Sequence, residues 1–176
     1  IWSSLVGSEM CIRDRVGIVA THAHMDHIGA LPHLADQFGC PIYTTPFTAA
    51  VLAPKLREAS SKAVVNIVHP GQSLALGPFQ LTWLPITHST PETNGLFIET
   101  AAGNIVHTAD WKIDPTPLVG QGFDRPLWQS LASKGVDAVV CDSTNAMNLG
   151  HSLSEADLYE GLFDLIQGAS GRVAVS

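Results

Sequence analysis

Short apolar runs alternate with longer amphipathic stretches along the chain. Two continuous apolar runs, 16–20 and 137–141, have the pattern of strands that are buried on both faces. Apolar positions at helical spacing predict helices over 28–38 and 47–59. A third helix is predicted over 154–167, because a serine at its start can cap the first turn.

Further short segments have the composition and length of strands, separated by Pro-Gly and Gly-Pro turns. They span 41–45, 64–68, 73–76, 79–85, 95–99 and 104–108, with a last strand-like run at 171–176. The segment 114–124 is rich in proline and glycine and is predicted to be a loop. Strands that alternate with helices, several of them pairing locally, predict an α/β fold with layered, mixed sheets.

Composition limits the class of protein. With 45% apolar and 14% charged residues among 176, the chain is unlike a disordered segment and has the length of about one domain. No apolar run reaches about 18 residues, so no membrane span is predicted. The net charge of −7 provides no general attraction for nucleic acid. Three cysteines without close spacing (Cys11, Cys40, Cys141) favour thiols in a reducing compartment, with Cys141 in a buried strand.

The first fifteen residues, IWSSLVGSEMCIRDR, lack the pattern of a signal peptide. Residues 5–15 are similar to the translation of a sequencing adapter. We therefore expect residues 1–15 to be a non-native leader, with a native amphipathic leader as the alternative. The chain then starts and stops within strand-like runs, and we expect it to be a piece of a longer gene product.

The stretch Thr21-His22-Ala23-His24-Met25-Asp26-His27 directly follows a predicted strand. His22 and His24 can point toward one position, and Asp26 and His27 toward a neighbouring one. Imidazole nitrogen and carboxylate oxygen are the ligands that Zn²⁺ takes in hydrolytic sites. The pattern predicts a two-metal site, in which the ions activate water and stabilise developing charge. The alternative is a set of polar residues that cap the next helix.

This motif resembles that of the metallo-β-lactamase superfamily, and three later segments extend the resemblance. They are 84–91 (LPITHSTP), 106–112 (VHTADWK) and 141–146 (CDSTNA), the last resembling the β-CASP branch with its ribonuclease J-like enzymes. The resemblance implies a partial αββα sandwich over 16–150. It also implies that 151–176 begins an inserted β-CASP α/β domain.

The resemblance also implies roles for individual residues. One zinc would be held by His22, His24 and His88. A second would be held in part by Asp26 and His27, and Asp110 would bridge the two ions. The family has a further ligand histidine, which lies in a later segment.

Asp26 would also help to take a proton, and Asp142 would support a ligating histidine. His151 is a candidate to approach the substrate. Ser143, Thr144 and Asn145 would bind phosphate or, alternatively, form an ordinary turn.

Other residues near these motifs have structural interpretations. Ala109 stands where the family usually has glycine, and Trp111 is expected to pack in the core. His33 and His69 are expected to have solvent-facing or structural roles. His107 is expected to act from outside the ligand set.

The leading hypothesis from the sequence is a zinc-dependent hydrolase of RNA phosphodiester bonds, both exonuclease and endonuclease. It would hold two Zn²⁺ ions in the complete site, bind RNA in the cytoplasm, make no use of a membrane and form a homo-oligomer. One alternative is another hydrolase of the superfamily, acting on thioesters, lactones or β-lactams. The other is a metal-binding piece without catalysis, because the second metal site is incomplete.

Overall fold

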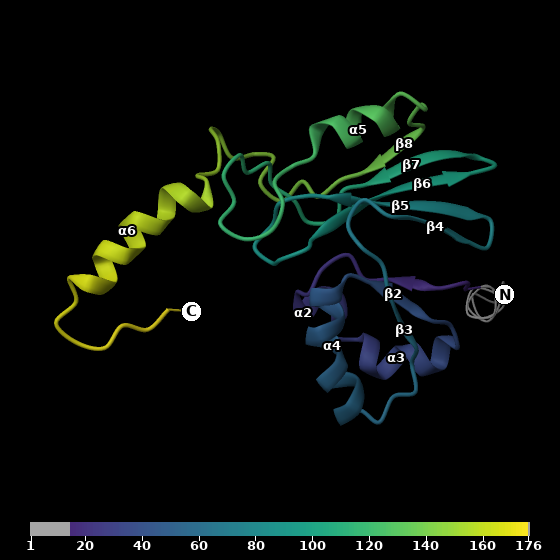
Figure 1. Ribbon diagram of the computed structural model, residues 1–176, viewed down its shortest axis with the longest axis horizontal. Coiled ribbons are helices and arrows are strands. Elements are labelled where there is room, and N and C mark those ends of the chain that lie inside the picture. The colour runs from purple at the N-terminus through teal and green to yellow at the C-terminus, as the bar shows by residue number, and fades with distance from the viewer. Residues whose placement is uncertain (1–14, 176) are drawn as a thin grey trace, which may run out of the picture.

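Two β-sheets stack face to face, with helices on both outer surfaces, in the computed structural model of the chain (Figure 1). The structure describes residues 15–175, so the predicted leader lies almost wholly outside the described residues. The first sheet is parallel and consists of β1 (Ile18–Val19), β2 (Ile42–Thr44) and β3 (Val65–Ile67), in that order.

The second sheet has five strands in sequence order. They are β4 (Ser73–Leu76), β5 (Phe79–Pro85), β6 (Asn94–Thr100), β7 (Gly103–His107) and β8 (Ala138–Val140). Adjacent strands in this sheet are antiparallel, except that β7 and β8 are parallel to each other. The mixed character expected from the sequence is therefore confirmed.

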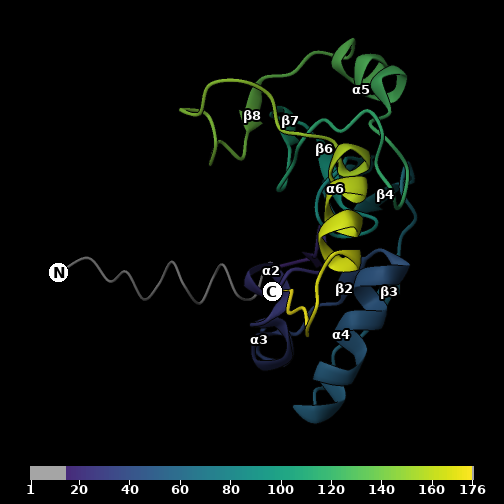
Figure 2. The same cartoon turned by 90° about the vertical axis from the view of Figure 1, so that its left-hand side faces the viewer.

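Helices complete a four-layer αββα arrangement. The helices α2 (Met25–Ile28), α3 (Leu31–Phe38) and α4 (Pro46–Glu58) lie on the side of the first sheet, and α5 (Arg125–Ala132) lies over the second (Figures 1 and 2). Helix α6 (Glu155–Gln167) projects away from both sheets and has no buried residue. None of the helices described between residues 15 and 175 combines the length and the apolar character that a membrane crossing requires.

Three apolar clusters join these layers. The first lies between α3, α4 and the first sheet and includes Ile42 and Leu52. The second, around Trp83, lies between the two sheets. The third places Leu84 and Phe97 against α5. Successive residues of a strand point to opposite faces, so Trp83 and Leu84 belong to different clusters and β5 is buried on both sides.

The structure differs from the expected elements in four respects. The helix predicted over 28–38 is divided, because the turn at 29–30 separates α2 from α3. Helix α5 was not predicted. The strand predicted over 137–141 is exposed, because β8 is the edge strand of its sheet, and Cys141 is exposed with it. Residues 171–175 form no strand.

Candidate metal centre

The loops that follow three strands meet at one edge of the sandwich. His22 and His24 follow β1, His88 follows β5 and Asp110 follows β7. Strands β5 and β7 run in the same direction because both are antiparallel to β6, so their carboxyl ends lie at the same edge. The backbone N–H of Asn94, on β6, donates to the carbonyl oxygen that precedes His22, at 3.1 Å, and ties the first loop to the second sheet.

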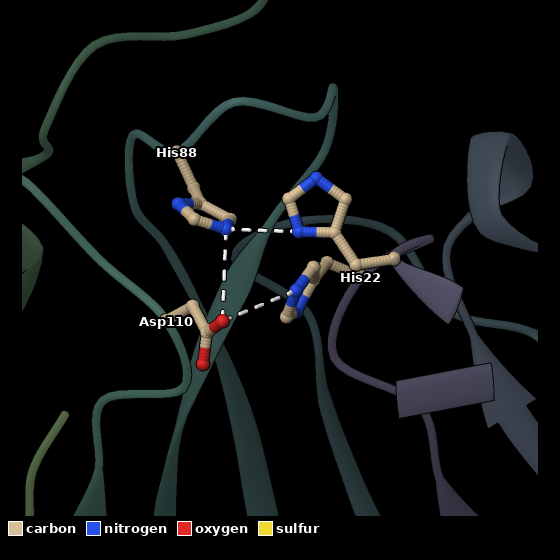
Figure 3. Close-up of side chains that lie close together, drawn as sticks. His22, His88 and Asp110 are labelled. Carbon is tan, nitrogen blue, oxygen red and sulfur yellow. Dashed lines mark hydrogen bonds and ion pairs between the residues drawn. The ribbon is translucent and has the colours of Figure 1, made fainter. Parts of the chain in front are cut away.

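A single carboxylate oxygen lies among three imidazole rings. Asp110 Oδ2 is 3.3 Å from Nε2 of His27, 3.7 Å from Nε2 of His88 and 3.8 Å from Nε2 of His22. Figure 3 shows His22, His88 and Asp110 pointing toward one another from separate segments. In this position Asp110 can contribute a ligand atom to each of two neighbouring metal-binding groups.

His24 completes the first group. Its Nδ1 lies 3.1 Å from Nε2 of His88. His22, His24, His88 and Asp110 each place one ligand atom within 4.8 Å of the others, and Asp26, His27 and Asp110 form a second group within the same limit. The structure thus brings together all six residues for which a metal-binding role is predicted.

The ring of His22 is fully buried, and its Nε2 has no hydrogen-bond partner among residues 15–175. Burial, followed by the neighbouring His27 and His88, lowers the pKa of His22 to about 4, so the ring is neutral at pH 7. The other ring nitrogen, Nδ1, is hydrogen-bonded to Thr21 Oγ1 at 3.0 Å. An unpartnered buried polar atom costs about 1–3 kcal/mol. A cation beside Nε2 would offset that cost, and the three-imidazole, one-carboxylate donor set fits Zn²⁺.

The turn that presents Asp110 is strained. Ala109 is buried and has φ +54°, in the left-handed region that glycine adopts more readily. His107 supports this turn, because its Nδ1 accepts a hydrogen bond from the Ala109 N–H at 3.0 Å. His107 therefore acts on the ligand turn from outside the cluster, as expected.

Replacing Ala109 with glycine is expected to raise the free energy of unfolding by about 1 kcal/mol, because glycine relieves the left-handed strain. The matched control is Ala50→Gly, on an exposed position inside α4, which should lower it by about 1 kcal/mol. Urea denaturation followed by circular dichroism measures both. Equal losses in the two variants would contradict a strained turn at Ala109.

Asp142 lies close enough to His88 for its charge to raise the pKa of that ring, although burial, the larger effect, lowers it. Its carboxylate accepts hydrogen bonds from the N–H and the hydroxyl of Thr144, which hold the pKa of Asp142 below its ordinary value. Trp111 is half-buried, stacks against Trp128 and donates from Nε1 to the carbonyl oxygen of Asp142 at 3.0 Å. Trp111 is therefore not a core residue as expected: it stacks on a second tryptophan while half-exposed, and its indole N–H holds the Asp142 segment.

The remaining predicted site residues do not join the cluster. Ser143 donates to the Cys141 carbonyl oxygen, and Asn145 accepts from Asn148, so with Thr144 they hydrogen-bond within their own turn. His151 is exposed and makes no hydrogen bond or ion pair with the cluster among the described residues. Substrate roles for these four residues stay predictions.

His33 and His69 are both exposed, outside the two ligand groups. The sequence predicts no role for two buried polar residues beside the cluster, Thr87 and Asp114. Thr87 is marked only by its position next to His88, and Asp114 belongs to a segment that is predicted to be a loop.

A family model for the beta-lactamase superfamily domain matches residues 11–151. The chain belongs to this superfamily, and the resemblance in its motifs and the αββα fold expected from them are confirmed. The match begins inside the segment predicted to be a leader.

Among curated proteins, the chain is similar to ribonuclease J of several bacteria. It is 40% identical to that of Sinorhizobium meliloti over 166 residues, which are 93% of this chain and 29% of that protein. It is 37% identical to that of Helicobacter pylori over 169 residues, 94% of this chain and 24% of that protein. The chain therefore spans less than a third of the length of these relatives.

Solved structures show the same fold at low sequence identity. A protein of unknown function from Enterococcus faecalis V583 superposes with a TM-score of 0.61 and 18% identity, over 86% of this chain and 38% of that one. Zn²⁺-bound PqqB from Methylobacterium extorquens superposes with a TM-score of 0.52 and 15% identity, over 70% of this chain and 44% of that one.

Proposed function

We propose that this chain carries the metal-binding part of a hydrolase that cleaves RNA phosphodiester bonds in the manner of ribonuclease J, from the 5′ end and internally. The observation that carries the proposal is the Asp110 carboxylate oxygen lying within 3.8 Å of three histidine nitrogens. The similarity to ribonuclease J of two bacterial species supports the choice of RNA as substrate.

In this proposal the two ligand groups hold two zinc ions. His22, His24 and His88 would hold the first, Asp26 and His27 would contribute to the second, and Asp110, which belongs to both groups, would be shared. Bound zinc would supply Lewis acidity that activates water and stabilises the charge developing on phosphorus.

The protein's own side chains prepare this chemistry. Burial keeps the His22 ring neutral, so its lone pair is available at neutral pH. The Asp26 side chain is 76% exposed, with one carboxylate oxygen 3.6 Å from His27 Nε2. From the open side of the site, this carboxylate can accept the proton that the attacking water loses.

Other residues have proposed roles around this centre. Asp142 would position His88 through its charge, and Ser143, Thr144 and Asn145 would bind a phosphate of the RNA. His151 would approach the substrate. Two bound metal ions would supply local positive charge near the scissile bond, against the net charge of −7.

We further propose that residues 151–176 begin an inserted β-CASP domain. By the same resemblance, the whole protein is cytoplasmic and forms a homo-oligomer.

The activity is tested on 5′-monophosphorylated RNA with and without a chelator, using both the 176-residue chain and the longest product of its reading frame. The longer product, loaded with zinc, should release nucleotides, and chelation should abolish the reaction. Chelator-resistant hydrolysis, or none with metal fully loaded, would contradict the proposal. Thioester, lactone and β-lactam substrates run in parallel, and preferential turnover of one of them would favour the other superfamily hydrolases.

A further inference from the structure

A fully buried carboxylate lies four residues after the proposed bridging acid, in the segment predicted to be a loop. Asp114 Oδ1 accepts hydrogen bonds from Ser154 Oγ at 2.6 Å and from the Thr116 N–H at 3.0 Å. Asp114 Oδ2 accepts one from the Glu155 N–H at 2.9 Å and pairs with Lys112 Nζ at 3.1 Å. Burial alone would raise the pKa of Asp114, but these contacts outweigh it and hold the pKa well below its ordinary value.

The backbone at Asp114 is fastened to the segment that bears His88. The Asp114 N–H donates to Thr87 Oγ1 at 2.9 Å, and the same hydroxyl donates to the Lys112 carbonyl oxygen at 2.5 Å. The Lys112 N–H in turn donates to the Thr87 carbonyl oxygen at 2.9 Å. Thr87 directly precedes His88, and Lys112 lies two residues after Asp110. These bonds therefore fix the spacing between two loops that carry proposed metal ligands.

The same carboxylate holds the start of α6. Ser154 is the buried N-cap of that helix, and both Ser154 Oγ and the Glu155 N–H donate to Asp114. The rest of α6 has no buried residue and extends away from the sheets (Figure 1). Because the residues of α6 are not buried, the junction at its first turn is its main attachment to the described part of the chain.

The geometry points to Asp114 as a positioning residue that couples the N-terminus of α6 to the metal centre through Thr87 and Lys112. This inference rests on the proposed metal site. Lys112 offsets the buried charge, and the hydrogen bonds from Ser154, Glu155 and Thr116 satisfy the remaining carboxylate lone pairs. Displacement of α6 would therefore move the loops of His88 and Asp110 relative to each other.

The test compares Co²⁺ binding by the 176-residue chain and its variants, because the visible spectrum of bound Co²⁺ reports the geometry of its ligands. Asp114→Asn puts an amide N–H₂ against groups that donate to the carboxylate. We expect it to weaken Co²⁺ binding by about tenfold, at the low end of the range for residues that orient ligands, and to change the spectrum. Ser154→Ala removes one of the two α6 donors to Asp114 and leaves the Glu155 N–H in place, so it should shift both readouts in the same direction, by less.

The matched control is Asp124→Asn. Asp124 also caps a helix, since its Oδ1 accepts from the Leu127 N–H at the start of α5. This variant keeps an N-cap oxygen and removes only the charge, so it should leave the affinity and the spectrum of bound Co²⁺ unchanged. The coupling is wrong if both Asp114→Asn and Ser154→Ala leave these readouts as in the wild type. If Asp114→Asn fails to fold, Ser154→Ala decides alone. Failure of the wild-type chain to bind Co²⁺ at all would instead overturn the proposed metal site.

Discussion

Replacing Asp110 with asparagine is expected to weaken Zn²⁺ binding by at least roughly a thousandfold. The substitution keeps the shape of the side chain and removes its charge. Two opposite unit charges about 4 Å apart, at an effective dielectric constant of about 20, attract each other by about 4 kcal/mol. Removing the carboxylate charge therefore costs at least this much of its attraction for the metal ion. Because each factor of ten in affinity corresponds to about 1.4 kcal/mol, the loss is about three orders of magnitude. Competition with a chromophoric chelator measures it.

Asp137→Asn is the matched control for this experiment. Asp137 is also an acid, and its Oδ2 accepts from the Asn104 N–H at 2.7 Å, at the opposite end of β7 from Asp110. Its replacement should leave Zn²⁺ affinity unchanged. Wild-type affinity in the Asp110 variant would show that the carboxylate among the histidines takes no part in holding metal.

Replacing Trp83 with alanine is expected to lower the free energy of unfolding by about 3–5 kcal/mol. Trp83 is fully buried in the cluster that joins the two sheets, where it packs with Val68, Leu76, Leu81 and Leu96. The two sheets carry different ligands: His22 follows the first, and His88 and Asp110 follow the second. The variant should therefore lose metal affinity together with stability. Urea denaturation followed by circular dichroism measures the change in the free energy of unfolding.

Trp83→Phe separates packing from polarity at the same position. The buried indole Nε1 has no hydrogen-bond partner in the described part of the chain. Phenylalanine therefore keeps most of the apolar contact and removes an unsatisfied donor. We expect a loss under about 2 kcal/mol. A loss in the alanine variant no larger than in the phenylalanine variant would mean that Trp83 does not hold the sheets together.

Local pattern predicts the elements whose ends are marked by turns. The limits of β4 and β5 follow from the turns at 70–71 and 77–78. Helix α5 was missed because only Leu127, Trp128 and Leu131 contribute to its apolar face, after a segment rich in proline and glycine. The prediction that β8 is buried is wrong because an apolar run indicates a strand but does not indicate whether other elements cover its faces.

The metal cluster could be predicted to a large extent because four of its residues lie within six positions, 22–27, and the other two lie in recognisable segments. The role of Asp114 could not be predicted. The two hydrogen bonds that tie it to α6 come from Ser154 and Glu155, about forty positions later, and no periodicity connects those residues. A buried carboxylate in a loop becomes visible only when the fold brings its donors to it.

The most direct measurement of the metal centre is anomalous X-ray diffraction at the zinc absorption edge, from crystals of the chain grown with Zn²⁺. We expect a peak among His22, His24, His88 and Asp110, about 2.0–2.2 Å from the ligating nitrogen and oxygen atoms. A second, weaker peak is expected beside Asp26, His27 and Asp110. A fully occupied zinc ion bound elsewhere, with these four side chains free of metal, would contradict the proposed centre.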